Sequence, residues 1–492
     1  MQSTFKFIDF LLVLPMITLF VFSLVPIAIK VFIRGNEEAK ADVNIGVAVF
    51  GVFISLVLMI LFHGRIFAGG TFFAFSQALV FDSFTFLSSI LTYLLAILAL
   101  PFLLNHPSVR RSQLSEFIFL YLNSLLGMIV MLSSNDLIVT FIGLEMMSLS
   151  LYMLITMSRE PHHSKEAAVK YFVLGSVASA ILLFGISFIY GSAVIVSNGQ
   201  IITNYSALVE VASELIATDR LFLVGYALVL IGFGFKISMF PFHSWVPDVY
   251  QGASTPLTLY MATAVKVASI LALTRFLMLD VLGDSFPLSA TLQWVAVLTM
   301  LVGNMGALAQ TSLKRIFAYS SVAHSGYILV SLVALGSEGG PFNENIKALM
   351  IYLLGYGLFS VGTFGFLSFL EKSPEDDIQL DSLKGFFHKS PWIALGLSFC
   401  LLGLAGIPPT LGFFTKFYIF SSAMNEGLYW LVTWALINSV IGVYYYLKPI
   451  ALMFFYSSDE DIYIADNQFQ KLIFLGVGFI SLLGGIFLPI FL

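Results

Sequence analysis

The sequence predicts an all-α polytopic membrane protein with about fourteen transmembrane helices. Three observations predict this fold. Of the 492 residues, 59% are hydrophobic and only 10% are charged, whereas soluble domains carry about 25% charged residues. Apolar windows of about 20 residues recur along the chain, and that length crosses a bilayer as a helix. Prolines interrupt two of these windows, a pattern typical of transporters.

The apolar windows follow one another from end to end. They are centred near residues 20, 54, 93, 124, 145, 179, 233, 266, 300, 326, 358, 406, 442 and 480. The first run, Phe7–Phe32, is longer than the roughly 7–15 apolar residues of a signal peptide, so we expect a retained first span. The longest polar connections, Gly191–Arg220 and Glu371–Lys389, leave no room for a soluble domain.

The interrupted windows are the seventh and the twelfth. The stretch Gly232–Pro256 begins inside the seventh window and breaks its helix at Pro241, and the twelfth window contains Pro408 and Pro409. Proline removes a backbone donor and clashes with the preceding turn. A broken helix is tolerated in a bilayer only where it packs in protein or lines a hydrated cavity. Both windows are therefore predicted to be broken helices beside a polar path.

The two breaks lie five spans apart, and an odd offset turns the second copy upside down in the bilayer. This offset predicts two inverted five-helix repeats, formed by spans 4–8 and spans 9–13. We expect one transmembrane domain, with three first helices at 1–110, the repeats at 115–278 and 289–456, and a last helix at 468–492.

Lysine and arginine are concentrated in the connections after odd-numbered spans. By the positive-inside rule these connections are cytoplasmic, and an even number of spans places both termini on the opposite side. Topology accounts for Lys314 and Arg315, and Asp82 and Asp136 are expected to be solvated residues at span starts. The basic residues are Lys30, Arg34, Lys40, Arg110, Arg111, Arg159, Lys165, Lys170, Lys314, Arg315, Lys372, Lys384 and Lys389.

Four ionisable residues stand near the middle of spans: Glu145, Lys236, Lys266 and Lys416. An unpaired charge at the bilayer centre costs about 2.5–3.5 kcal/mol on insertion scales. A lysine near a helix end can instead snorkel to the interface, but Glu145, Lys236 and Lys266 have long apolar stretches on both sides. We therefore expect these groups to be paired, hydrated or partly neutral.

Glu145 is the only carboxylate of the four, so by elimination it is the expected partner of Lys236. An opposite charge keeps both groups ionised, whereas desolvation favours their neutral forms. A lysine that alternates between these surroundings can take up and release a proton near neutral pH. We hypothesise that opening and closing of the Glu145–Lys236 pair controls the protonation of Lys266 or Lys416.

Two histidines also lie within spans. His324, in the run YSSVAHSGYIL, is interpreted either as a proton relay or as a hydrogen-bonded structural residue, and the structural role suits His243 better. A haem held by both histidines is a further alternative without other support. The single cysteine, Cys400, excludes a disulfide framework and an iron–sulfur cluster with about four cysteine ligands. The net charge of −5 suggests no nucleic-acid partner.

With these residues, the chain resembles the antiporter-like membrane subunits of respiratory complex I and of multisubunit sodium/proton antiporters. In that family a glutamate of helix five, lysines of helices seven and eight, and a lysine or glutamate of broken helix twelve carry the proton path. The resemblance assigns these roles to Glu145, Lys236, Lys266 and Lys416.

Two segments narrow the resemblance within the family. The run DVYQGASTP, Asp248–Pro256, is similar to the N-type subunits of NADH:quinone oxidoreductase, and Lys170–Gly191 is similar to their sixth helix. The resemblance implies a proton-translocating subunit in a bacterial inner membrane, with both termini on the periplasmic side. It also implies partner membrane and peripheral subunits that hold the flavin, the iron–sulfur clusters and the quinone, while this chain binds no cofactor or metal.

Two other functions stay open. The chain could serve a multisubunit (Mrp-type) Na⁺/H⁺ antiporter, with the same residues and no redox partners, although the run at Asp248–Pro256 argues against this. It could also be a passive spacer between active subunits. Four costly intramembrane charges argue against a spacer, because leucine would serve that purpose better.

Overall fold

The computed structural model describes residues 7–32, 37–63, 70–104, 106–157, 161–196, 202–279, 287–337, 344–373, 376–457, 463–465 and 467–491. Within these residues, twelve helices are long and apolar enough to cross a membrane. The seventh and twelfth windows form the broken helices that complete the expected set. The all-α polytopic fold is thus confirmed, while the limits of the repeats at 115–278 and 289–456 stay predictions.

The helices follow the order of the predicted spans. The first spans are α1 (Phe7–Phe32), α2 (Glu37–His63) and α3 (Ser83–Ala99), which η2 (Leu100–Leu103) extends. The next are α4 (Leu114–Leu132), α5 (Leu137–Thr156), α6 (Pro161–Val196), the broken pair α8 (Arg220–Lys236) and α9 (Trp245–Gly252), and the run α10 (Thr255–Tyr260), η4 (Met261–Val265) and α11 (Lys266–Leu277). The last are α12 (Pro287–Leu308), α13 (Leu313–Val333), α14 (Glu344–Leu370), the broken pair α16 (Pro391–Ala405) and α17 (Leu411–Asn425), α18 (Tyr429–Phe455) and α19 (Gln468–Phe491).

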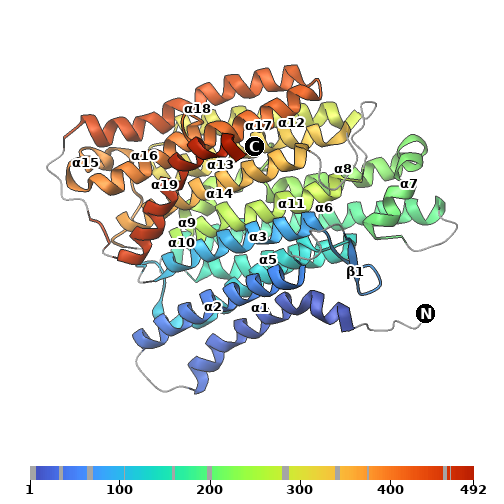
Figure 1. The fold of residues 1–492 in the computed structure, drawn as a ribbon, viewed down its shortest axis with the longest axis horizontal. Coiled ribbons are helices and arrows are strands. Elements are labelled where there is room, and N and C mark those ends of the chain that lie inside the picture. Colours follow the sequence, from blue (N-terminus) through green and yellow to red (C-terminus); the bar gives the residue numbers. More distant parts are fainter. Residues whose placement is uncertain are drawn as a thin grey trace.

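The long helices run side by side in one bundle, with α1 and α2 at one edge and α18 at the opposite edge (Figure 1). The interior consists of α10–α11, α13 and α14, whose membrane windows are almost wholly buried within the chain. The outer helices α1, α2, α6, α18 and α19 bury fewer than half of the residues in their membrane windows. Residues carried by the central helices are therefore shielded from lipid by the rest of the chain.

Small elements outside the spans were not predicted. Strand β1 (Phe72–Ala74) pairs antiparallel with β2 (Leu79–Phe81) before α3. Helix α7 (Tyr205–Thr218) lies in a connection that was expected to be polar and irregular. Both lie at the same end of the bundle (Figure 1). Helix α7 is amphipathic, since it buries Leu208 and Leu215 and exposes Glu210. The remaining short elements are η3 (Arg111–Gln113), η5 (Ala334–Ser337), η6 (Leu380–Leu383) and α15 (Phe386–Lys389).

The first break begins earlier than Pro241 itself. Helix α8 ends at Lys236, because the ring of Pro241 would clash with the carbonyl of Ile237, four residues before it. Side chains bond the backbone groups that the break frees. Ser325 donates to the Ile237 carbonyl at 2.5 Å, and the Phe240 N–H donates to the Thr299 hydroxyl at 2.9 Å. The break is thus packed in protein, as a membrane interior requires.

The second break separates α16 from α17 and contains Pro408 and Pro409. Helix α16 ends at Ala405 and is capped by Gly406, whose φ of 77° favours glycine. A Cβ at Gly406 would also lie 2.8 Å from Cδ of Lys416. Glycine therefore allows the lysine side chain to fold back over the end of α16.

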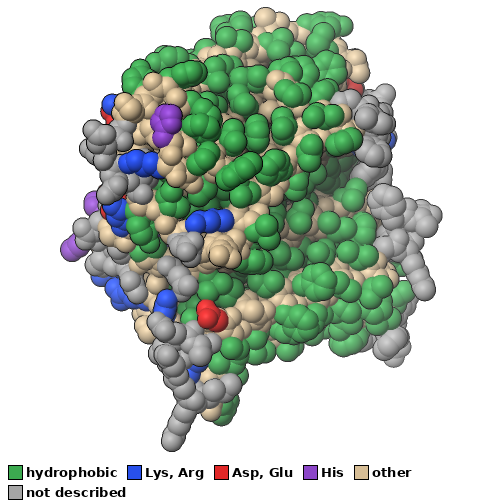
Figure 2. All heavy atoms as spheres, turned by 60° about the vertical axis from the view of Figure 1, so that its left-hand side comes forward, with side chains coloured by type: hydrophobic (Ala, Val, Ile, Leu, Met, Phe, Trp, Pro, Cys, Tyr) green, Lys and Arg blue, Asp and Glu red, His purple; other side chains and the backbone are tan. Residues whose placement is uncertain are grey.

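The surface is mainly hydrophobic, and Lys, Arg and His side chains gather along one margin of the view in Figure 2. Arg34 and Arg159, two of the basic residues used for topology, lie outside the described residues.

The expectation for Asp82 was wrong. Its carboxylate caps α3 and forms an ion pair of 2.9 Å with Arg275, and only 12% of its side chain is exposed. Burial would raise the pKa of Asp82, but the Arg275 guanidinium outweighs burial and lowers it.

Candidate functional site

Lys236 is the last residue of α8, and 5% of it is exposed. Its ammonium donates to the Ser148 hydroxyl at 2.7 Å and to the Tyr152 hydroxyl at 3.3 Å. It also lies 5.4 Å from the ring centre of Tyr171, within cation–π range. Neutral hydroxyl and aromatic groups of α5 and α6 therefore solvate this buried cation.

Glu145 lies on the same face of α5 as Ser148 and Tyr152, at spacings of three and seven residues. Its carboxylate accepts a hydrogen bond from Ser179 of α6. The expected direct ion pair between Glu145 and Lys236 is not formed in the described part of the chain, where Ser148 takes the place of the carboxylate. A short movement of the lysine along α5 would exchange one partner for the other.

Lys266 begins α11, directly after the π-helical turn η4. A π turn interrupts the regular helical ladder and is frequent at functional sites. The Lys266 ammonium donates to the Ser321 carbonyl at 2.5 Å and to the Ser321 hydroxyl at 2.6 Å. The Tyr356 hydroxyl lies 2.9 Å from the same serine oxygen. Lys266 is 2% exposed, so these groups of α13 and α14 replace its hydration.

His324 lies one turn beyond Ser321 on α13 and is buried. Its Nδ1 is 2.6 Å from the Tyr352 hydroxyl, and its Nε2 is 3.1 Å from the Tyr446 hydroxyl. Both ring nitrogens are therefore engaged, which leaves neither free as a haem ligand. The geometry suits both interpretations of His324, since a relay and a structural histidine need the same two bonds. The ring of His243 stacks on Phe240, and its Nδ1 has no hydrogen-bond partner among the described residues.

Lys416 lies in α17, after the second break, and is 6% exposed. Its ammonium donates to the Ala405 carbonyl at 3.0 Å and to the Ser439 hydroxyl at 3.1 Å. It also lies 4.9 Å from the ring centre of Tyr327. The lysine thus bonds the last carbonyl of α16, and each of the two breaks has a buried lysine beside it.

The structure connects these residues through α13. The Ser325 hydroxyl contacts both the Ile237 carbonyl at the first break and, at 3.2 Å, the Ser321 carbonyl that Lys266 uses. The rings of His324 and Tyr327 are 5.6 Å apart, and Tyr327 faces Lys416. Helix α13 therefore contacts the first break directly after Lys236, and it also contacts the buried Lys266 and Lys416.

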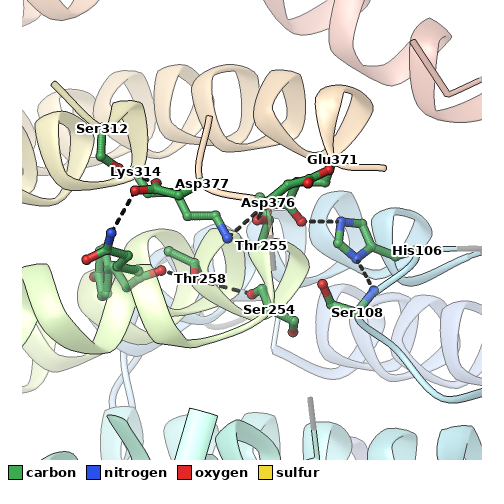
Figure 3. A network of polar contacts seen from close by, with 12 residues as sticks. His106, Ser108, Ser254, Thr255, Thr258, Ser312, Lys314, Glu371, Asp376 and Asp377 are labelled. Carbon is green, nitrogen blue, oxygen red and sulfur yellow. Dashed lines mark hydrogen bonds and ion pairs between the residues drawn. The ribbon is translucent and has the colours of Figure 1, made fainter. Parts of the chain in front are cut away.

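The sequence reasoning missed the hydroxyl groups that bind the lysines. A signal for them is present, because Ser148 and Tyr152 share a helix face with Glu145 and Ser321 shares one with His324 and Ser325. The reasoning also misjudged Lys314, which is 4% exposed and forms an ion pair of 2.7 Å with the buried Glu371. This pair belongs to a separate polar network (Figure 3).

Comparison with known proteins agrees with this geometry. The family model described as "NADH:quinone oxidoreductase/Mrp antiporter, TM" matches residues 134–442. NADH-quinone oxidoreductase subunit N of Bdellovibrio bacteriovorus is 48% identical over 455 residues, which cover 92% of this chain and 90% of that protein. The chain belongs to this family of membrane subunits, on its subunit N branch.

Two solved structures share the fold. A chain of respiratory complex I from Thermus thermophilus superposes with a TM-score of 0.78 at 30% identity, covering 96% of this chain and 98% of that one. A chain of the Mrp complex from Dietzia sp. superposes with a TM-score of 0.81 at 20% identity, covering 98% and 95%. The second likeness shows the fold alone. The family membership confirms the resemblance found in the sequence.

Proposed function

We propose that this chain is the N-type membrane subunit of a bacterial NADH:quinone oxidoreductase and that it translocates protons through Glu145, Lys236, Lys266 and Lys416. The observation that carries the proposal is the set of three buried lysines, each solvated by hydroxyl, carbonyl or aromatic groups instead of a carboxylate, two of which contact α13. Among the described residues none of these three ammonium groups forms an ion pair, so neutral dipoles and rings alone contact the buried charges.

In the proposed mechanism, a proton passes between lysines when an ammonium changes its partner. Lys236 moves from Ser148 to Glu145, where the carboxylate favours its charged form, and back to Ser148, where the neutral form is easier to reach. Ser321, Ser325, His324 and the surrounding tyrosine hydroxyls supply the hydrogen-bonded groups between stations. His324 acts as a relay in this scheme, since Tyr352 and Tyr446 bond its two nitrogens.

The redox chemistry belongs to partner subunits in this proposal. Flavin, iron–sulfur clusters and quinone are held by other membrane and peripheral subunits, and conformational or electrostatic changes there drive the lysines here. The translocase activity is therefore a property of the whole complex. We place the chain in the bacterial inner membrane with both termini on the periplasmic side. The basic residues after odd-numbered spans support this orientation.

The experiment is proton translocation by the purified complex in proteoliposomes, measured as protons moved per NADH oxidised. Lys266→Ala should lower this ratio strongly while the complex still assembles. Lys347→Ala is the matched control, because Lys347 lies in the first turn of α14, 45% of its side chain is exposed, and its ion-pair partner among the described residues is the neighbouring Glu344. Normal translocation by Lys266→Ala would contradict the proposal.

The alternative is a subunit of a multisubunit Na⁺/H⁺ antiporter, which would use the same buried residues. The fold shared with the Mrp complex chain is compatible with it. The cofactor content of the native complex separates the two, because only the oxidoreductase contains flavin and iron. A complex purified through this chain that lacks both would favour the antiporter.

A further inference from the structure

A second buried charged cluster lies apart from the proton path, where α14 ends. The Glu371 carboxylate, 1% exposed, contacts Lys314 of α13 at 2.7 Å and His106 Nε2 at 3.0 Å, and it accepts a hydrogen bond from Thr255 at the start of α10. Figure 3 shows these side chains converging on Glu371 from separate segments. We call these four residues the Glu371 cluster.

The cluster joins the Glu371–Lys314 ion pair to His106, whose Nε2 faces the carboxylate. His106 Nδ1 accepts the Ser108 N–H at 3.2 Å, so the ring proton is assigned to Nε2, which faces Glu371. Burial would raise the pKa of Glu371, but the Lys314 charge and the His106 bond outweigh it and lower the pKa to about 2. The carboxylate is therefore ionised at neutral pH and holds its three partners.

The same helices meet again at Lys266. Thr255 begins the segment that carries Lys266, and Lys314 lies on α13 two turns before Ser321, which accepts from Lys266. Helix α14, which ends directly before Glu371, carries Tyr356, whose hydroxyl bonds Ser321. The three helices are thus joined once at the Glu371 cluster and once at the contact between Lys266, Ser321 and Tyr356.

A small cavity lies between these two junctions. Apolar side chains line part of it. The rest of its lining consists of hydroxyl side chains of α13 and α14, which are Ser320, Ser321, Tyr356, Ser360 and Thr363. Close packing resists relative movement of helices, and a cavity removes part of that resistance. The relative positions of α13 and α14 at this level therefore depend on how firmly their ends are held, and with them the position of Ser321, which accepts from Lys266.

We propose that Glu371 is a positioning residue for proton transfer at Lys266, holding α10–α11 and α13 at their first turns so that the Lys266 ammonium reaches Ser321. The proposal rests on the proposed proton-translocating function. Small misplacements of reacting groups, of about 1 Å, lower rates up to roughly a hundredfold. Loss of the Glu371 charge therefore slows proton transfer without removing any station of the path.

The test uses the intact complex in proteoliposomes and measures protons translocated per NADH, subunit content and thermal stability. Glu371→Gln should lower translocation by roughly tenfold in an assembled complex, and Glu371→Asp, which keeps the charge, should restore most of it. Asp82→Asn is the matched control, because it also neutralises a buried carboxylate, at the start of α3, that forms an ion pair, in this case with Arg275. It should lower stability and leave translocation within about twofold of wild type.

A double-mutant cycle with Ser321→Ala separates positioning from general stability. If Glu371 acts through the Lys266–Ser321 contact, Glu371→Gln should add little to the loss that Ser321→Ala causes alone. Losses that multiply, failure of Glu371→Asp to rescue, or normal translocation by Glu371→Gln would each overturn the proposal. Should Glu371→Gln fail to assemble, Thr255→Val tests the same coupling with Ser321→Ala, since it removes only the α10 hydroxyl bond.

Lys266→Ala in the same assay separates the proposed proton-translocating function from the positioning role of Glu371. Normal translocation by Lys266→Ala would contradict the proposed function itself. Loss of translocation by Lys266→Ala together with normal translocation by Glu371→Gln would overturn only the positioning role.

Discussion

The ammonium of Lys236 lies 2.7 Å from the hydroxyl of Ser148, one helical turn from Glu145 on the same face of α5. The carboxylate of Glu145 is bonded instead by Ser179 of α6. The pair is therefore in an open arrangement, with each partner held by a serine. Closing the pair requires the Lys236 ammonium to exchange Ser148 for Glu145, which lies on the same face of α5.

The first prediction concerns this pair. Lys236→Ala and Glu145→Gln should each lower redox-linked proton translocation by at least about tenfold. The first removes the lysine, and the second removes the charged partner that the lysine would reach. The double variant should lose less than the product of the two single losses, since both changes abolish the same exchange. Proton translocation per NADH in proteoliposomes measures all three. Losses that multiply would show two independent sites.

The second prediction separates a proton station from a structural cation at Lys416. Arginine keeps its charge at every relevant pH, so Lys416→Arg should lower proton translocation by at least about tenfold with little loss of assembly. Lys416→Glu should retain more, because a carboxylate can also titrate. A structural cation on the Ala405 carbonyl predicts the reverse order, with arginine tolerated and glutamate destructive. The measurement is proton uptake by vesicles that contain each variant.

The third prediction tests membrane topology by labelling single cysteines from either side. Cys400, which is buried, is first replaced by alanine. A cysteine at Asp381, whose side chain is 78% exposed after the eleventh span, should react only from the cytoplasmic side. A cysteine at Glu210 on the exposed face of α7 should react only from the periplasmic side. Reaction of both from one side would mean that the span count is wrong.

The fourth prediction concerns stability at acid pH. The pKa of Glu371 is lowered in the folded protein from 4.5 to about 2. A depressed pKa contributes stability that is fully present above about 4.5 and is lost as the pH falls towards 2. Thermal unfolding in detergent between pH 7 and pH 3 should therefore fall less steeply for Glu371→Gln than for wild type below pH 4.5. Parallel curves would show that Glu371 is not held ionised by Lys314.

The sequence by itself determined the spans, the breaks and the four charges near the middle of spans. A bilayer demands about 20 apolar residues per helix and makes each intramembrane charge costly, so both features are visible as local patterns. Prolines act on the turn that precedes them, which places Pro241 and Pro408 at breaks without knowledge of any neighbour. Glu145, Lys236, Lys266 and Lys416 could therefore be selected from the sequence.

Only the tertiary structure decided which groups those residues meet. Ser148 is 88 residues from Lys236 in the chain, and Ser321 is 55 residues from Lys266. A serine that bonds its own helix, as Ser269 does with the Val265 carbonyl, looks the same in sequence as one that binds a lysine. Helix rotation and packing choose between these outcomes, and they also turned Lys314 from a surface charge into a buried partner of Glu371.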